Sequence, residues 1–296
     1  MGNDFKDVEK NDKHILLNIF IILFLILIVC FLYARYISTT GLIVKEYKVS
    51  SNKIPENFNG VKIVHISDIH YGSTTFMKDI KRLVKKVNEI EPDLIVFTGD
   101  LIDEAYKIND KVKTELTTEL SKLDNNLGKY AVYGEEDVTN ESFNIIMKDS
   151  GFTILNNSYD LIYNKGLTPI YLGGTASSLS DVVDLDKTFA YYKKDKKGVY
   201  DPPYKIILTH EGDNASDIIS YDKDTDLILA GHSHNGQIVI PFYGGVYIPE
   251  GSQKYNAPHY EISGTNIYIS SGIGTSIFNY RFLNKPSINL YRLSTR

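Results

Sequence analysis

The sequence predicts an α/β protein in which two packed sheets carry helices on their outer faces. In the first half of the chain, short apolar stretches of strand length alternate with amphipathic stretches of helix length, a pattern typical of strands joined by crossover helices. Residues 237–293 are rich in tyrosine, glycine and residues that favour β-structure,. The 296 residues are 43% hydrophobic, which suits one large domain with an ordinary core.

An apolar segment precedes this domain. Residues Ile15 to Tyr33 contain one strongly polar residue, Asn18. As a helix that rises roughly 1.5 Å per residue, the segment matches the ~30 Å hydrocarbon core of a bilayer. A cleavable signal peptide would have a shorter apolar run followed by a small-x-small site, which is missing after Leu32,. A buried core helix would not be apolar on every face. We therefore expect one uncleaved transmembrane helix.

The order of segments divides the chain into four parts: a tail at 1–14, an anchor at 15–33, a tether at 34–42 and one domain at 43–296. Basic residues flank the anchor on both sides, but after Arg35 the next one is Lys45. This distribution places the N-terminus in the cytoplasm. We expect a single-pass protein of the cell membrane with its domain on the extracytoplasmic side.

Local patterns predict the elements of the domain in order. Apolar residues recur at helical spacing from Phe76 to Ile90, and Pro92 closes that helix,. The run from Asp93 to Thr98 is apolar enough for a strand buried on both faces. By the same criteria the strands are expected at 43–49, 61–66, 93–98, 129–133, 154–156, 160–163, 170–173, 204–209 and 226–230. The helices are expected at 76–90, 109–123, 142–148, 185–193 and 215–220.

Composition excludes several classes of protein and site. The net charge is −5, whereas proteins that bind nucleic-acid backbones carry an excess of Lys and Arg. The one cysteine, Cys30, lies in the apolar segment, so neither a disulfide framework nor a thiolate metal site is available. We expect no nucleic-acid partner.

Aspartate and histidine side chains follow four of the predicted strands at their carboxyl ends. They are Asp68, His70, Asp100, His210, His232 and His234. In extended backbone, residues at i and i+2 face the same way, so each close pair can converge on one site. Mixed carboxylate and imidazole ligands suit Mn²⁺, Fe or Zn²⁺. Two such ions about 3.5–4 Å apart would generate hydroxide and clamp a phosphoryl group, which predicts hydrolysis of a phosphate ester.

Any one of these residues taken alone would be an ordinary polar loop residue, and other histidines fit that interpretation. His65 lies within a strand and is expected to be a hydrogen-bonded structural residue. His259 lies in a Pro-His-Tyr loop and His14 precedes the anchor. We expect none of these three to bind metal.

The ordered set resembles a known family. The segments that carry the resemblance are 64–72, 99–103, His210, 231–237 and 271–276. They resemble the calcineurin-like metallophosphoesterase superfamily, and the last two resemble its membrane-associated bacterial phosphodiesterase branch. The resemblance spans about residues 43–293 and implies a four-layer α/β/β/α sandwich of two mixed sheets.

The resemblance also implies a ligand set for two divalent metal ions. One metal would be held by Asp68, His70, Asp100 and His234. The other would be held by Asp100, His210, His232 and a residue of the family's Gly-Asn-His-Asp/Glu block. Asp100 would then bridge the two ions.

Residues 134–137 depart from that block. Glu135 stands where the family has a metal-binding Asn, and a carboxylate oxygen can replace the amide as a ligand. Glu136 stands where the family has a His that stabilises the transition state or protonates the leaving group. At pH 7 a carboxylate accepts hydrogen bonds but donates none. Either Glu136 stays protonated beside Glu135 and Asp137, or the substrate brings a leaving group that needs no acid.

Three functions are compatible with these observations. The first is a membrane-anchored metal-dependent phosphohydrolase or phosphodiesterase, with Glu136 and His210 as catalytic residues and a lipid-linked or cell-wall-linked phosphate ester as substrate. The second is a metal-binding pseudoenzyme impaired by Glu135 and Glu136. The third is a binding module that uses the tyrosine-rich loops around Tyr243, Tyr247, Tyr255 and Tyr260, although half-buried packing in β-structure explains these tyrosines better.

Overall fold

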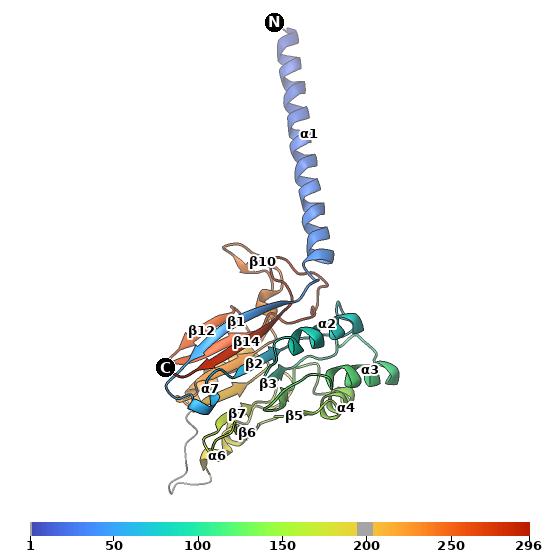
Figure 1. Cartoon of the computed structure of the whole chain (residues 1–296). Helices are drawn as coiled ribbons and strands as arrows, with labels where there is room; N and C mark the ends of the chain where they lie inside the picture. The colour runs from blue at the N-terminus through green and yellow to red at the C-terminus, as the bar shows by residue number, and fades with distance from the viewer. Residues whose placement is uncertain (1, 194–203) are drawn as a thin grey trace.

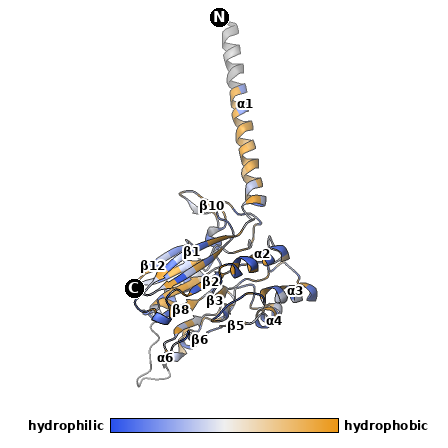
Figure 2. Cartoon of the chain, in the orientation of Figure 1, coloured by the Kyte–Doolittle hydropathy of each residue, from blue (hydrophilic) through white to orange (hydrophobic). Residues whose placement is uncertain are grey.

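The computed structural model describes residues 2–193 and 204–296. A long N-terminal helix, α1 (Gly2–Leu32), continues into a π-helical turn, η1 (Tyr33–Ile37). It rises alone from the globular part, and its C-terminal end lies near β10 (Figure 1). His14 to Ile37 are long and apolar enough to cross a membrane, as the hydropathy colouring shows (Figure 2). This stretch contains the predicted anchor, and the predicted tail is helical from Gly2; residue 1 lies outside the described residues.

The first sheet has six strands. Their spatial order is β1 (Ile43–Ser50), β14 (Ser287–Ser294), β2 (Lys62–Ile66), β3 (Leu94–Thr98), β4 (Lys129–Val132) and β5 (Phe152–Ile154). All neighbours are parallel except β14 and β2, which are antiparallel. The first and last strands of the domain therefore pair with each other.

The second sheet also has six strands. Their order is β12 (His259–Ile262), β13 (Thr265–Ile269), β9 (Leu227–Ala230), β8 (Lys205–Leu208), β7 (Ile170–Gly174) and β6 (Ser158–Ile162). The central strands are parallel and the two edge strands are antiparallel to their neighbours. A separate two-stranded ribbon joins β10 (Val239–Ile240) and β11 (Gly244–Gly245).

Helices cover the outer face of each sheet. On the first sheet they are α2 (Met77–Asn88), α3 (Asp110–Leu120) and α4 (Glu141–Asp149). On the second they are α5 (Leu185–Thr188), α6 (Ala190–Lys193) and α7 (Ala215–Tyr221). Short 3-10 turns lie at η2 (Glu56–Phe58), η3 (Gly212–Asn214) and η4 (His234–Gly236).

Alternating side chains of the strands build separate cores. In β3, Ile95 and Phe97 pack with α2, α3 and α4, whereas Leu94 and Val96 face the second sheet. In β8, Ile207 packs toward α7. The period-two alternation of a strand thus places one core between the sheets and one under each helical layer. The four-layer α/β/β/α sandwich of two mixed sheets is confirmed.

Several elements, such as α3 and β6, differ by one to three residues from their predicted bounds. Two others differ in position or continuity. The strand expected at 154–156 forms at Phe152–Ile154, because Gly151 turns the chain in the left-handed region (φ 85°) and the buried Phe152 then enters the core. The helix expected at 185–193 is broken at Phe189 into α5 and α6. The break turns the buried Phe189 ring onto Tyr171, with ring centroids 6.1 Å apart.

His65 is the buried polar residue of β2. One ring nitrogen, Nε2, lies 2.8 Å from Thr98 Oγ1, and the ring is fully buried. Burial lowers the pKa of His65 to about 3. In the unfolded chain this group titrates near pH ~6.5. Between these two values the unfolded chain binds more protons, so the free energy of unfolding falls as the pH falls through this window.

We expect the His65→Asn variant to lose part of this acid sensitivity. Between about pH 7.5 and about pH 5, the free energy of unfolding of the wild type should fall by about 2 kcal/mol more than that of the variant. Urea unfolding of both chains at the two pH values measures the difference in slope. Equal pH dependence in the two chains would contradict the assignment of His65 as a neutral buried residue.

Candidate metal centre

The predicted Asp and His side chains come from neighbouring strand ends of the two sheets. Asp68 and His70 follow β2, Asp100 follows β3, His210 follows β8, and His232 and His234 follow β9. All six are almost fully buried, none exposing more than 6% of its surface. Because β2 and β3 pair in one sheet and β8 and β9 pair in the other, the packing of the two sheets brings the four loops together.

The backbone of these loops differs from the extended conformation assumed from the sequence. Five of the six residues are in the left-handed region, with φ values of 51° for Asp68, 41° for His70, 60° for Asp100, 63° for His232 and 49° for His234. Non-glycine residues rarely adopt such angles, and they collect where the surroundings force them. The loops therefore hold strained backbone at the candidate site.

Three glycines allow the loops to approach one another. A Cβ on Gly134 would overlap Asp100 Oδ1, and a Cβ on Gly231 would overlap Ser67 Oγ. Gly99, with φ 94°, would carry a Cβ that overlaps the backbone of Gly134. The backbones at Gly99 and Gly134 therefore lie too close together for a side chain at either position,.

The side chains form two groups with metal-ligand spacing. One contains Asp68, His70 and His234, and the other contains Asp100, His210 and His232; within each group the ligand atoms lie within 4.8 Å of one another. His70 Nε2 is 3.7 Å from Asp100 Oδ2, which lies 3.2 Å from His210 Nε2. Asp100 therefore lies between the two groups, where a bridging ligand would have to be.

Hydrogen bonds orient three of the four histidine rings toward the centre. His210 Nδ1 donates to the Thr98 carbonyl at 2.6 Å, His232 Nε2 donates to the Glu250 carbonyl at 2.8 Å, and His70 Nδ1 lies 3.0 Å from Glu136 Oε2. A ring that donates through its outer nitrogen presents a lone pair on the other, which is the arrangement of metal-binding histidines.

Two polar atoms at the centre support the fit of a cation. Asp68 Oδ2 and His210 Nε2 are buried and have no hydrogen-bond partner among the described residues. Leaving buried polar atoms unpaired is costly, and a divalent ion would satisfy both kinds of atom. The donor set of carboxylate oxygens and imidazole nitrogens thus fits two divalent cations, whose identity the side chains do not define.

The buried charges perturb one another strongly. Burial would raise the pKa of Asp100, but His210, His70 and His232 outweigh it and hold that pKa well below its ordinary value. Burial would lower the pKa of His70, but Glu136, Asp100 and Asp68 raise it to about 9. Asp100 and Asp68 also raise the pKa of His210 against the effect of burial, whereas burial lowers that of His234. Without cations, the carboxylates thus draw protons onto His70 and His210, and metal binding would have to displace these protons.

Glu135 and Glu136, which replace the family's Asn and His, lie beside different histidines of the site. Glu135 Oε1 lies 3.7 Å from His232 Nδ1, beside the second group. Glu136 Oε2 accepts from His70 Nδ1 and, at 3.1 Å, from the Glu104 N–H. Burial raises the pKa of both glutamates. Glu135 therefore lies beside the second group. Glu136 forms a third possible metal-ligand group with His70 and Asp100, and it is also placed to orient the His70 ring.

Asp137 and Arg281 belong to the site but are missing from the predicted residues. The buried Asp137 carboxylate accepts from the backbone N–H groups of Asp100, Leu101 and Gly134 at 2.7, 3.1 and 2.9 Å. It ties the loop after β3 to the loop after β4. The fully buried Arg281 lies 3.1 Å from His234 Nδ1 and donates to the Ser271 carbonyl at 2.7 Å. For Arg281, the signal in the sequence was a single arginine between apolar and aromatic residues.

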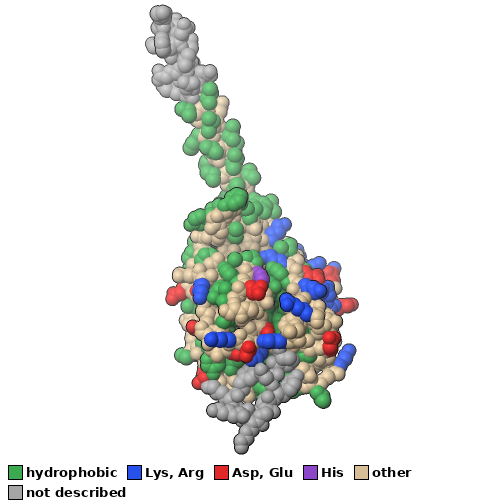
Figure 3. All heavy atoms as spheres, turned by 90° about the vertical axis from the view of Figure 1, so that its left-hand side faces the viewer, with side chains coloured by type: hydrophobic (Ala, Val, Ile, Leu, Met, Phe, Trp, Pro, Cys, Tyr) green, Lys and Arg blue, Asp and Glu red, His purple; other side chains and the backbone are tan. Residues whose placement is uncertain are grey.

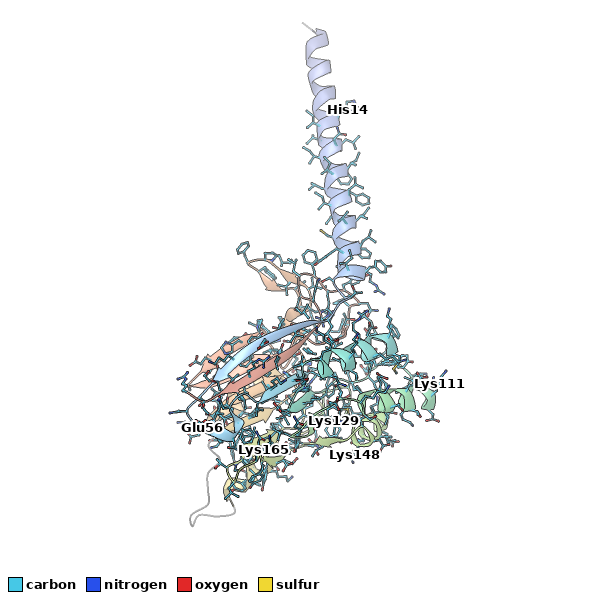
Figure 4. The ribbon with its side chains drawn as sticks, viewed as in Figure 1. His14, Glu56, Lys111, Lys129, Lys148 and Lys165 are labelled. Atoms are coloured by element: carbon cyan, nitrogen blue, oxygen red, sulfur yellow. The ribbon has the colours of Figure 1, made fainter. Side chains whose placement is uncertain are left out.

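The remaining histidines lie elsewhere. His65 is hydrogen-bonded within the core, as described above. His259 begins β12, is exposed, and its Nε2 lies 3.0 Å from Asn266 Oδ1. His14 projects from α1 far from the globular part (Figure 4). None of the three belongs to the metal-ligand groups found among the described residues.

A pocket of about 520 Å³ opens onto the two ligand groups. Its walls differ in character. Near the ligands they are acidic and include Glu104, Glu135, Glu136 and Glu250, and farther away they are apolar and include Ile238, Val246, Tyr247, Ile277 and Phe278. A substrate with one charged end and one apolar end would match this division.

Comparisons with known proteins agree with this geometry. The family model described as calcineurin-like phosphoesterase matches residues 61–236. The metallophosphoesterase YkuE of Bacillus subtilis is 32% identical over 268 residues, which cover 89% of each chain. The phosphodiesterase YaeI of Escherichia coli is 24% identical and covers 80% of this chain and 84% of its own.

One relative is a transmembrane protein of a vertebrate. A transmembrane protein with a metallophosphoesterase domain from Danio rerio is 26% identical over 76% of this chain. The match spans 53% of that relative. With the family model covering more than half of its residues and with two groups of metal-ligating side chains at its strand ends, the chain belongs to the calcineurin-like phosphoesterases.

Proposed function

We propose that the protein is a membrane-anchored phosphohydrolase that uses two divalent cations to cleave phosphate diesters. The observation that carries the proposal is the pair of adjacent buried ligand groups, one of which contains Asp100. The relative YaeI, named as a phosphodiesterase, supports the diester class. The apolar helix from His14 to Ile37 supports anchoring. The distribution of basic residues around it favours a domain outside the cytoplasm.

Two cations bound here would supply Lewis-acid activation of water and would neutralise charge on the phosphoryl oxygens. The residues of the chain define the geometry. Asp100, His210 and His232 form one half of the cradle, and Asp68, His70 and His234 form the other. The phosphoryl group enters from the pocket, and the buried walls around the ligands limit the access of bulk water.

In this proposal Glu136 is a positioning residue for His70. Its carboxylate accepts from His70 Nδ1, so it is not a free donor for a departing alkoxide. No residue at the position of the family's His then donates a proton, so the leaving group must depart unprotonated. Loss of a general acid costs about 10²–10⁴ in rate for substrates that need one. The preferred substrates are therefore esters with good leaving groups.

The pseudoenzyme remains the second candidate, because Glu135 and Glu136 add negative charge where an anionic substrate binds. The complete set of Asp and His ligands favours the enzyme over it. A binding module without metal is disfavoured, since the buried Asp68 Oδ2, which has no hydrogen-bond partner among the described residues, would then carry a cost without a function,.

We expect the full chain in detergent to hydrolyse bis-p-nitrophenyl phosphate when Mn²⁺ is added, and Asp100→Asn to lower kcat by about 10² or more because it removes a charge between the two ligand groups. Release of p-nitrophenol and bound metal content are measured together. Asp103→Asn, on the same loop but outside both groups, is the matched control and should retain activity. Metal binding without turnover in the wild type would favour the pseudoenzyme.

Replacing Glu135 by Asn and Glu136 by His restores the family's pair of residues. We expect the double variant to raise kcat for a methyl phosphodiester, which has a poor leaving group, by about 10²-fold. The rate for bis-p-nitrophenyl phosphate should change little, because p-nitrophenolate is a stable anion that departs without an acid. Steady-state kinetics on both esters measure the contrast. An equal effect on the two esters would contradict the assigned loss of a general acid.

A further inference from the structure

Two loops beside the pocket expose apolar side chains to an unusual degree. We call them the apolar rim and define them as residues 238–247 and 276–283. Their most exposed large side chains are Phe242, Tyr243, Val246, Tyr247, Ile277 and Leu283, each at least half exposed. The single charged residue of the rim is Arg281, which is fully buried. Contiguous exposed apolar surface of this kind marks an interaction site.

The apolar rim touches the C-terminal end of the anchor helix. Phe31 and Tyr280 pack with ring centroids 5.2 Å apart, and Tyr33 and Phe282 pack edge to face at 5.7 Å. The Arg281 N–H donates to the Ala34 carbonyl at 3.0 Å. Figure 3 shows hydrophobic side chains on α1 and on the end of the globular part from which α1 rises.

These contacts set the depth of the apolar rim relative to a bilayer. Phe31 and Tyr33 belong to the segment that is apolar enough to span the membrane, so the side chains that pack on them lie at the same depth. Tyr243, Tyr247 and Tyr280 provide the aromatic side chains that concentrate at the headgroup level of membrane proteins. Lipid is therefore the occupant that the position of this surface favours over a soluble partner.

The apolar rim also connects the anchor to the pocket. A groove of about 500 Å³ runs along α1 and is lined by Leu27, Ile28, Phe31, Ile238 and Phe282, among other apolar residues. Ile238 also lines the pocket that holds the ligand groups, together with Val246, Ile277 and Phe278. An apolar surface thus continues from the side of the anchor helix into the pocket.

We propose that the apolar rim lies in the bilayer surface and that the apolar half of the pocket holds the hydrocarbon chain of an amphiphilic phosphate ester taken from that bilayer. This inference rests on the proposed phosphohydrolase and names its substrate class. The phosphate lies at the ligand groups, and the chain runs past Ile238 and Ile277 toward the groove along α1.

The first test compares two esters with the same leaving group, methyl p-nitrophenyl phosphate and hexadecyl p-nitrophenyl phosphate, in mixed micelles with the full chain and Mn²⁺. We expect kcat/KM for the hexadecyl ester to be at least about tenfold higher, a ratio for which burial of about two methylene groups suffices. The ratio should fall in the double variant Ile277→Ser/Phe278→Ser. Both side chains are largely exposed, so the substitutions leave the core intact.

Leu167→Ser is the matched control. Leu167 is 94% exposed in the loop between β6 and β7, next to Lys165, which lies at the end of the globular part away from α1 (Figure 4). This variant should keep the wild-type ratio. Hydrolysis of both esters at similar efficiency would overturn the inference and leave the phosphohydrolase standing. Hydrolysis of neither ester would overturn both.

A second test does not depend on turnover. The chain contains no tryptophan, so Phe242→Trp and Leu167→Trp each introduce a single reporter. In phosphatidylcholine and phosphatidylglycerol vesicles whose acyl chains carry bromine, we expect strong quenching of the fluorescence of Trp at position 242 and none at position 167. Equal quenching at the two positions would overturn the immersion of the apolar rim.

Discussion

The candidate site depends on the burial of negative charge where the two sheets meet. Asp68, Asp100 and Asp137 expose at most 2% of their surface, and Glu135 and Glu136 stand beside them. Isolated carboxylates cannot be buried together without compensation. His70 and His210 supply part of it through proton uptake, as the raised pKa of each indicates. Cations in the two ligand groups would supply the remainder, so metal binding and the stability of these loops are linked.

The same constraint explains the architecture around the site. The loops after β2, β3, β8 and β9 must meet within a few ångströms, which requires glycine at positions 134 and 231 and left-handed backbone at five of the six ligands. Such backbone is costly unless other contacts hold it. Asp137 provides three of these contacts, because its carboxylate accepts from backbone N–H groups of both loops. Asp137 therefore stabilises the geometry of Asp100 without facing the pocket.

Much of the fold and of the ligand set could be predicted because both leave local patterns. The period-two and helical spacings located β3 and α2 to within two residues at each end, and Asp or His after a strand marked each candidate ligand. Other features depend on contacts between distant segments, which periodicity does not report. The pairing of β1 with β14, the left-handed backbone of His70, and the contact of Arg281 with His234 across 47 residues arise only when the sheets pack. The hydrogen bond between Glu136 and His70 likewise leaves no local pattern, because it joins loops that are 66 residues apart.

On the proposed function, a single explanation accounts for both the acidic half of the pocket and the apolar rim. Glu104, Glu135, Glu136 and Glu250 line the approach to the ligand groups, and each partly solvated charge repels a phosphate by about 1 kcal/mol or less. A small soluble phosphodiester would have only the cations at the ligand groups to offset this repulsion. An alkyl chain gains about 0.8 kcal/mol for each methylene group that it buries, so about ten methylene groups outweigh the combined repulsion. The negative charge of Glu135 and Glu136 weakens the binding of a phosphate. On the proposed function, the apolar surface that runs from Ile277 to the anchor compensates for this loss by binding the alkyl chain.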